Sequence, residues 1–578
     1  MTVAQQHGSL SNRAVLAPLA LGLSAFSLLG RSLLAATLRM FCPCAWPVLH
    51  ALSLACLLPA RQRHWVPRPL LVLGRPFVTP LLVCSIASPI VKRLFPDAWR
   101  TGRMWRQFVP VYVWYLWTRR QCSNSSGRSP EDKARRWQHR HEWGGRKVYA
   151  MVLDLSGYYV KSAQIMATKG DFMPEQWTRR LVKLFDSMPP RPWREVKQSL
   201  QHQVRLSPLG EQKAAMGKKL LLGGAFEIVQ EESLASASIA QVHCARLAAN
   251  VASQLAWQYG PAVVVKVQHR HMESLMHSDL RNIGRLARVM RSVLPFDVMP
   301  MVEEIRDAVP KEFDFLREAR LMQAIRRRLL ACGWQGVAIP QPLLALSTPR
   351  LLVMQHMPGV PFTQLLPQAA KDAAVHARLA RAVNGLLEVY GRMILGDGLF
   401  HADPHPGNLL LQDDDTLVLL DFGQCKALAA PRQLAFARMI LALDGGTPEQ
   451  IAVAMAHLGL DFTANAGGPA SPLQVTKMAY IMFDTRYLPE ACISPLSENA
   501  VIKSIPLTAF PSDLYMVLRA MMLLRGLCFG LGLDIQSAAL WRKYAEAVLK
   551  DPELSLRAEE NRWLDLGEGA PHNGMAAQ

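Results

Sequence analysis

The feature that most restricts the fold of this chain is a pair of polar segments separated by a short apolar stretch. The first segment is His401-Ala402-Asp403-Pro404-His405-Pro406-Gly407-Asn408, here called the octet, and the second is Asp421-Phe422-Gly423. Residues 409–420 between them consist of two aliphatic runs split by three aspartates. Two apolar runs around a polar turn predict a β-hairpin. Such a hairpin brings Asp421 back beside Asn408, so that two oxygen ligands converge on one cation.

The spacing within the octet indicates phosphoryl-transfer chemistry. Asp403 and Asn408 are five residues apart, as in a kinase catalytic loop. In that loop the aspartate orients the acceptor or accepts its proton, and the asparagine binds Mg²⁺. By itself the octet also suits a transition-metal site of two histidines, or a proline-rich turn. Combined with Asp421 and a lysine upstream, it favours a Mg²⁺-nucleotide site.

The upstream lysine, Lys266, lies in an apolar strand, residues 262–267. Burying an unpaired ammonium group is costly, so an acidic partner is expected. Candidates lie in the segment that contains Glu312, Asp314 and Glu318. On a helix Glu312 and Glu318 point well apart, so we expect them to serve different lysines. The alternative is that this segment is only a charged helix face.

A small β-rich lobe is predicted around this strand. Residues 226–229 and 262–267 are rich in β-branched residues and flank a turn of small residues, 234–243. In ordinary kinases the corresponding turn is a glycine-rich phosphate loop. Here it contains no glycine, but alanine and serine still permit a close backbone approach. Residues 350–354 predict a strand that leaves this lobe, and a long helix at 377–395 opens a mainly helical region.

Charge and composition set the N-terminal region apart. The first 96 residues contain nine Lys and Arg and no acid, which is typical of organelle transit peptides. Its apolar run Val15–Gly30 is shorter than the ~20 residues that span a bilayer comfortably. Of the net charge of +20, +17 belongs to the first 150 residues, and the rest has 44 basic against 41 acidic residues. A nucleic-acid partner is therefore not expected.

Three segments lead into the catalytic region. The aromatic run 108–117 is bracketed by arginines and suits either a membrane interface or a buried helix. The polar stretch 121–141 predicts a linker. From residue 148 the pattern is helical and places Lys161 and Gln164 on one helix face, either as a solvated stripe or as one buried polar face.

These motifs, in this order, resemble the UbiB-type, or aarF-domain (ADCK), family of atypical kinases. That family has a Lys-x-Gly-Gln helix, an Ala-rich loop, a Glu-x-Asp helix and a His-x-Asp-Pro-x-x-x-Asn loop. By resemblance the motifs correspond, in turn, to Lys161 with Gln164, to Ala235-Ser236-Ala237-Ser238, to Glu312 with Asp314, and to Asp403, Asn408 and Asp421. Two positions depart from the pattern: Ala163 replaces the glycine, and Ser236 replaces one alanine.

The resemblance implies an α+β, bilobal protein-kinase-like fold with a helical N-terminal extension that carries Lys161 over the active site. Glu312 would then face Lys161, and Glu318 would pair with Lys266. The implied cofactors are ATP and Mg²⁺. The implied activity is ATP hydrolysis or small-molecule phosphorylation that supports isoprenoid-quinone or lipid metabolism at a mitochondrial or, alternatively, plastid membrane, after removal of the transit segment.

A peptide substrate is not expected. His405 stands two residues after Asp403, where ordinary kinases have a lysine, and the chain after Asp421 leads directly toward a helix near Pro431. Two other functions stay open: a catalytically weak, nucleotide-gated lipid-binding or scaffold protein, and an aminoglycoside-phosphotransferase-like small-molecule kinase. The Lys161 helix and the glycine-free loop argue against the second.

We therefore predict a domain order and a set of site residues. The domains are the transit region 1–96, the helical extension 97–215, the N-lobe 216–357, the C-lobe 358–550 and a tail 551–578. Predicted catalytic residues are Asp403, Lys266 and Lys161; nucleotide-binding residues are Ala235, Ser236, Ala237, Ser238, Lys266, Glu318, Gln164 and Glu312; metal ligands are Asn408 and Asp421. The apolar run 517–533, with Arg519 and Arg525, is expected to be core without chemistry. Expected partners are a nucleotide, a lipid or quinone precursor, a membrane surface, and a biosynthetic complex or a second copy.

Overall fold

The computed structural model describes residues 94–123, 129–167, 174–184, 190–237, 239–270, 272–290, 303, 306, 310–464, 468–486, 507–509 and 511–567. Contacts divide the chain into two units, residues 1–155 and residues 156–578. Residues 1–93 of the predicted transit segment, including the run Val15–Gly30, lie outside the described residues. None of the described helices combines the length and the apolar character that a membrane-spanning helix needs.

The described part of the first unit is a helical hairpin of α4 (Pro96–Ser123) and α5 (Pro130–Leu155). The prediction of a linker over 121–141 is wrong, because α4 continues to Ser123 and α5 begins at Pro130. Residues 130–141 are rich in good helix formers. Their aromatic groups also pack on α4, where the Tyr115 hydroxyl lies 3.0 Å from His141 Nδ1. Packing thus stabilises a helix in a segment that looked polar throughout.

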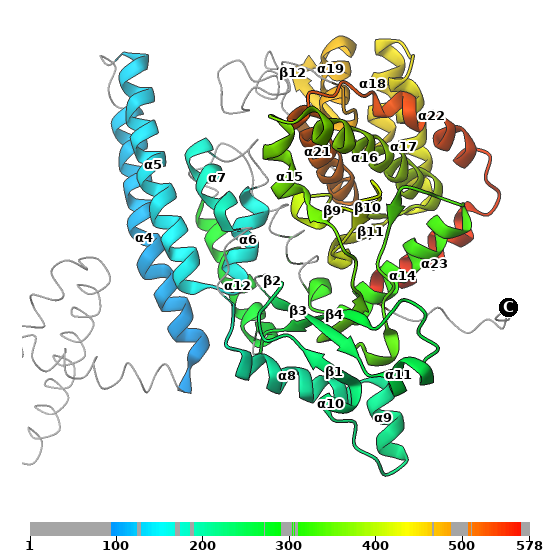
Figure 1. The fold of residues 1–578 in the computed structure, drawn as a ribbon. Coiled ribbons are helices and arrows are strands. Elements are labelled where there is room, and N and C mark those ends of the chain that lie inside the picture. Colours follow the sequence, from blue (N-terminus) through cyan, green and yellow to red (C-terminus); the bar gives the residue numbers. More distant parts are fainter. Residues whose placement is uncertain are drawn as a thin grey trace, which may run out of the picture. The chain divides into compact units, whose positions relative to one another are not determined.

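The second unit contains a small antiparallel sheet in the order β1-β3-β4-β6, with β2 paired to β3 (Figure 1). The strands are β1 (Phe226–Val229), β2 (Ala235–Ser236), β3 (Ala240–Leu247), β4 (Ala262–Gln268) and β6 (Leu351–Gln355). The predicted strands at 226–229, 262–267 and 350–354 are confirmed to within one residue at each end. The predicted turn 234–243 is wrong in extent: Ala235 and Ser236 pair with Val242 and Gln241, because the backbone ladder of β3 extends to them.

The alternation of side chains along β4 decides where Lys266 points. Val263, Val265 and Val267 belong to the hydrophobic core that the sheet forms with α8 (Trp193–Leu206). Successive residues of a strand face opposite sides of the sheet. Lys266 therefore points to the other face, where α14 (Phe315–Ala331) packs against β6.

The second unit contains further elements before the helical lobe, and the last of them, β5, pairs with β10 (Leu417–Leu419) in another sheet. They are α6 (Tyr158–Ala167), α7 (Glu175–Leu181), α9 (Pro208–Ala215), α10 (Leu222–Ala225), α11 (Ala249–Gln254), α12 (Met272–Met290) and β5 (Val337–Ala338).

The helical lobe is built around α16 (Ala373–Gly391), which continues into a π-helical turn, η4 (Arg392–Asp397). Trp541 lies so close to Gly391 that a Cβ there would overlap the ring, and its indole nitrogen donates to Leu387 O at 2.7 Å. Around α16 lie α15 (Phe362–Ala369), α17 (Ala430–Leu443), α18 (Pro448–His457), α19 (Pro472–Phe483), α21 (Tyr515–Gly530), α22 (Ser537–Val548) and α23 (Leu554–Leu566).

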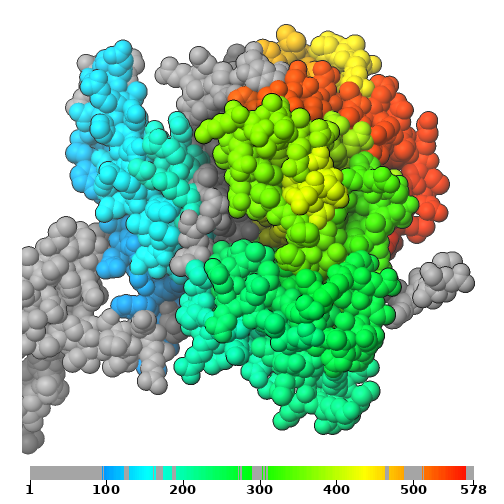
Figure 2. Space-filling view, viewed as in Figure 1, coloured from blue at the N-terminus to red at the C-terminus, as the bar shows by residue number. Residues whose placement is uncertain are grey.

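Short strands between the two lobes carry the octet and Asp421. The predicted hairpin is confirmed: β9 (Leu409–Leu411) pairs antiparallel with β10 (Leu417–Leu419), with Leu417 opposite Leu411. A second pair joins β8 (Leu399–His401) to β11 (Cys425–Ala427). In Figure 2 the sheet lobe, in teal and green, meets the helical lobe, in yellow-green to red, along a furrow. The structure confirms the predicted α+β, bilobal, kinase-like fold.

Candidate active site

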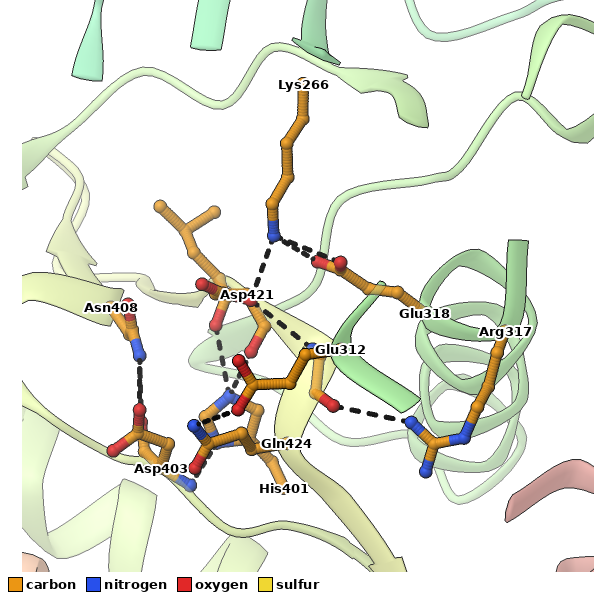
Figure 3. Close-up of polar contacts among 11 residues, drawn as sticks. Lys266, Glu312, Arg317, Glu318, His401, Asp403, Asn408, Asp421 and Gln424 are labelled. Atoms are coloured by element: carbon orange, nitrogen blue, oxygen red, sulfur yellow. Dashed lines mark hydrogen bonds and ion pairs between the residues drawn. The ribbon is translucent and has the colours of Figure 1, made fainter. Parts of the chain in front are cut away.

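Lys266 is the centre of a group of three charges that joins the two lobes. Its ammonium donates to Glu318 Oε1 at 2.8 Å and Oε2 at 3.0 Å, and to Asp421 Oδ1 at 3.0 Å (Figure 3). The Phe315 ring lies beneath it, 5.1 Å from Nζ to the ring centre. Burial lowers the pKa of Lys266, but attraction to Asp421 and Glu318 more than offsets this and raises it above its ordinary value. Lys266 is therefore a fixed cation.

Glu318 is held in place by the way α14 begins. The side chain of Asp314 accepts hydrogen bonds from Leu316 N and Arg317 N, both at 3.0 Å, and so caps the helix. Glu318 follows one turn later and is only 2% exposed. Burial, helped by Asp421 and opposed by Lys266, raises the pKa of Glu318 to about 7. The structure thus makes the pairing with Lys266 that the sequence suggested, and Asp314 acts as a helix cap.

Asp421 stands at the end of the hairpin in an unusual backbone conformation. Its φ of 58° and ψ of 79° lie in the left-handed region, which residues other than glycine seldom occupy. Such strain costs roughly 1–3 kcal/mol and persists only where the surroundings enforce it. The side chain accepts from Gly423 N at 3.3 Å and is 49% exposed. The carboxylate is therefore positioned by strained backbone and accessible to a ligand.

His401, the first residue of the octet, ties the two catalytic segments together. Its Nε2 lies 2.8 Å from Asp421 O and 3.1 Å from Leu420 O. Carbonyl oxygens only accept, so Nε2 carries the proton, and Nδ1 accepts from the Tyr390 hydroxyl at 2.9 Å and from Asp403 N at 3.3 Å. Burial lowers the pKa of His401, which keeps the ring neutral.

This arrangement argues against the alternative of a two-histidine metal site. Both ring nitrogens of His401 are bonded within the protein, and His405 Nδ1 accepts from Gly407 N at 3.1 Å. Across the described ranges no cluster of three or more His, Cys, Asp or Glu could hold a metal ion.

Asp403 and Asn408 lie together on the helical lobe. Asn408 Nδ2 donates to Asp403 O at 3.1 Å and lies 3.5 Å from Asp403 Oδ2. Leu420 N donates to Asn408 O at 2.9 Å, which fixes the octet to the residue before Asp421. Arg519, which was expected to be core without chemistry, also reaches this place: its Nη2 donates to Asp403 Oδ1 at 2.8 Å. In the sequence, the signal for Arg519 was its charge within the apolar run 517–533.

The oxygen ligands suit Mg²⁺ bound together with a nucleotide. Asn408 engages Asp403 through its amide nitrogen, so its amide oxygen is the atom that a cation would use. The half-exposed Asp421 carboxylate supplies a second ligand. Mg²⁺ commonly takes one or two protein ligands and completes its octahedron with phosphate oxygens and water. Asn408 and Asp421 therefore fit the ion, provided that a phosphate chain brings the remaining ligands.

The predicted residues of the helical extension and the small-residue loop are only partly described. Lys161 and Gln164 lie on α6, but their side chains are outside the described part of the chain, as is Ser238. Glu312 is buried and accepts from Gln424 Nε2 at 2.8 Å. The expected contact between Glu312 and Lys161 stays a prediction, as does nucleotide binding by residues 235–238.

The segment after Asp421 is short and fully structured. Residues 422–424 form a 3₁₀ turn, β11 follows, and α17 begins at Ala430. Arg317 holds this segment: its guanidinium donates to Gly423 O and Cys425 O, both at 3.3 Å. It also donates to Asp565 O at 2.6 Å, which attaches α23 to the same place. There is no room in residues 422–429 for a peptide-binding activation segment.

Fold and site define a kinase-like domain of the atypical kind. Residues 183–453 match the family described as the ABC1 atypical kinase-like domain. The chain therefore carries an ABC1 atypical kinase-like domain, which confirms the resemblance to UbiB and aarF-domain kinases.

Relatives agree with this assignment. "Uncharacterized protein slr0889" of Synechocystis is 26% identical, over 51% of this chain and 68% of that protein. Protein ACTIVITY OF BC1 COMPLEX KINASE 7, chloroplastic, of Arabidopsis thaliana is 27% identical, over 56% of this chain and 42% of that protein. Probable protein kinase UbiB of Shewanella woodyi is 27% identical, over 50% of this chain and 48% of that protein. The chain thus spans about half the length of the last two.

Solved structures are similar as well. The Mycobacterium tuberculosis protein in the Rv3197–erythromycin complex aligns with a TM-score of 0.44 at 20% identity, over 71% of this chain and 97% of that one.

Proposed function

We propose that this chain binds Mg²⁺-ATP between its two lobes and transfers the γ-phosphoryl group to water or to a small molecule. The observation that carries the proposal is the Lys266 ammonium held at 2.8 Å by Glu318 and at 3.0 Å by Asp421. A buried, permanently charged lysine next to an accessible carboxylate suits a nucleotide whose phosphates arrive with a metal ion.

Each residue of the site has a definite task in this proposal. Lys266 binds the phosphate chain while Glu318 keeps the ammonium in position. Asn408 and Asp421 hold Mg²⁺, which neutralises phosphate charge when bound. Asp403 orients the attacking hydroxyl or water and accepts its proton. His401 keeps Asp403 and Asp421 at a fixed separation through its two ring nitrogens.

The proposed acceptor is not a peptide, because residues 422–429 form no platform for one. We infer a role in isoprenoid-quinone or lipid metabolism at an organelle membrane, by analogy with the family. Relatives from Arabidopsis thaliana are named chloroplastic, which favours the plastid over the mitochondrion for this chain as well.

A membrane surface is proposed as a partner on the basis of α4. Phe108, Val111 and Tyr115 are buried, whereas Trp114 is 41% and Trp117 48% exposed. The aromatic run therefore serves as helix core on one side and presents indole rings on another, close in sequence to Arg119 and Arg120. Aromatic and basic side chains together suit a lipid headgroup region. This observation also favours the second candidate, a nucleotide-gated lipid-binding protein with weak turnover.

ATP turnover by the full chain, with and without anionic liposomes, tests the proposal. Asp421→Asn should abolish turnover, and Asp413→Asn, in the exposed hairpin turn, should not. Retained turnover in Asp421→Asn would reject the proposed site, and ATP binding without turnover in the wild type would favour the lipid-binding alternative. If α4 binds lipid, Trp114→Ser/Trp117→Ser should remove any liposome stimulation and leave basal turnover unchanged.

A further inference from the structure

Arg519 reaches the octet from a helix far along the chain. It lies on α21, outside residues 183–453 that match the family, and pairs with Asp403 at 2.8 Å. Its side chain is 7% exposed, and that of Asp403 is 15% exposed. Its neighbours on the helix, Val517, Ala520, Met521 and Leu524, are all buried and apolar. A buried ion pair seldom stabilises more than apolar residues of similar volume would, so stability alone does not account for an arginine here.

The pairing with Asp403 leaves part of the guanidinium unused. Among the described residues Arg519 Nε has no hydrogen-bond partner, although the atom is buried. In a planar guanidinium group the Nε–H and one Nη2–H leave from the same edge. The nitrogen that donates to Asp403 thus shares an edge of the group with the unpartnered Nε–H. A buried, unsatisfied donor costs roughly 1–3 kcal/mol, which an incoming oxygen would recover.

The octet itself contains no lysine or arginine. The position two residues after Asp403 is His405, whose Nδ1 is already engaged with Gly407 N. In phosphoryl transfer negative charge spreads over the three equatorial oxygens of the transferred group, and a positioned arginine stabilises that charge. Arg519 is a permanent cation in contact with the proposed base of this site.

We propose that Arg519 is a catalytic residue of the phosphoryl-transfer site, an inference that rests on the proposed function. Its Nη2 orients Asp403, and its Nε–H binds an oxygen of the γ-phosphoryl group. The acceptor oxygen forms a bond to the γ-phosphorus, the bond from that phosphorus to the β–γ bridging oxygen breaks, and ADP leaves with the electron pair. The acceptor proton passes to the Asp403 carboxylate.

The test compares Arg519→Gln and Arg519→Lys with Arg525→Gln in the full chain. Arg525 lies on the same helix but donates to Asp484 O, at 2.8 and 3.0 Å, and is the matched control. We expect Arg519→Gln to lower kcat about 10³-fold, as loss of an arginine that stabilises the transferring group does. Arg519→Lys, which keeps the charge but loses the forked donors, should lower kcat about 10²-fold. The Kd for ATP should stay within about threefold in both, since the effect is confined to the transition state.

A second readout separates catalysis from folding. Aluminium fluoride with Mg²⁺-ADP mimics the transferring phosphoryl group and should raise the Tm of the wild type and of Arg525→Gln above the value with Mg²⁺-ADP alone. Arg519→Gln should keep the rise in Tm caused by Mg²⁺-ADP and lose the additional rise, here called the increment, caused by aluminium fluoride.

The outcomes distinguish the two proposals. If the wild type turns over ATP and Arg519→Gln keeps both kcat and the increment, the role of Arg519 is rejected and the proposed function stands. If the wild type binds no nucleotide, the proposed function is rejected. If Arg519→Gln does not fold, Arg519→Lys decides, and a wild-type kcat in that variant would overturn the inference.

Discussion

Removing the cation at position 266 should be more harmful to the fold than removing almost any other lysine. In Lys266→Met the carboxylate of Glu318, 2% exposed, loses the ammonium group at 2.8 Å and keeps Asp421 as a second acid nearby. Breaking a buried pair by removing one partner costs about 3–5 kcal/mol. We therefore expect the free energy of unfolding to fall by about that amount at pH 8.

The loss of stability should depend on pH, and the direction of this dependence follows from the pKa of Glu318. The pKa of this carboxyl is about 7 in the folded wild type and rises further without the lysine. A folded-state pKa above the unfolded value means that the folded protein binds more protons, so stability falls as pH rises from about 4.3 through the folded pKa. Lys266→Met should therefore be less destabilised at pH 6 than at pH 8.

Urea unfolding followed by circular dichroism at the two pH values provides the measurement. The double variant Lys266→Met/Glu318→Gln should recover a large part of the lost stability. The second substitution replaces the buried carboxylate at position 318, which has lost its cation, by a neutral amide. Lys197→Met, at an exposed position of α8, is the control and should stay within about 0.5 kcal/mol of the wild type. A single variant as stable as the wild type at pH 8, or a double variant no better than the single one, would refute the reasoning. Neither variant at position 266 should turn over ATP.

Two further predictions concern acid and the C-terminal helix. Burial lowers the pKa of His141 and His269 to about 4 and that of His401 below its usual value. Unfolded histidines take up protons below pH ~6.5 before these do, so thermal unfolding scans should show Tm falling as pH drops from 6.5 toward 4; a constant Tm over this range would contradict it. Asp565→Asn should cost about 1.5–3 kcal/mol, because the buried Arg317 loses its charged partner on α23. It should also lower kcat by loosening the segment after Asp421. Glu559→Gln, exposed on the same helix, should change neither, and an unchanged Tm and kcat in Asp565→Asn would show that α23 does not support the site.

Local sequence patterns predicted the elements that carry the site. The hairpin at 409–420 and the strand around Lys266 follow from short apolar runs with polar breaks, and strands form wherever such runs find a partner. The choice of Glu318 over Glu312 for Lys266 followed the family resemblance. The assumption that both residues share one helix is wrong, because α14 begins at Phe315 and Glu312 lies before its cap, Asp314.

Local patterns failed where a neighbour in space decided the outcome. Residues 130–141 have the polar composition of a linker, but they form a helix because their aromatic rings pack against Tyr115 of α4. Ala235 and Ser236 looked like part of a loop, but the adjacent strand β3 offered backbone partners. In both cases a weak local preference was overridden by packing or pairing with another segment.

The sequence alone was enough to predict the catalytic loop, the metal ligands and the strand lysine, because each is recognised by spacing within one short segment. Two contacts could be found only in the folded chain: Arg519 reaches Asp403 from 116 residues away, and Arg317 binds Asp565 across 248 residues. Contacts at such separations depend on how whole helices pack. Helices pack by burying apolar surface, and the pattern of apolar residues in a sequence does not show which charged side chains this packing brings together. The octet by itself therefore gave no sign of the arginine that contacts it.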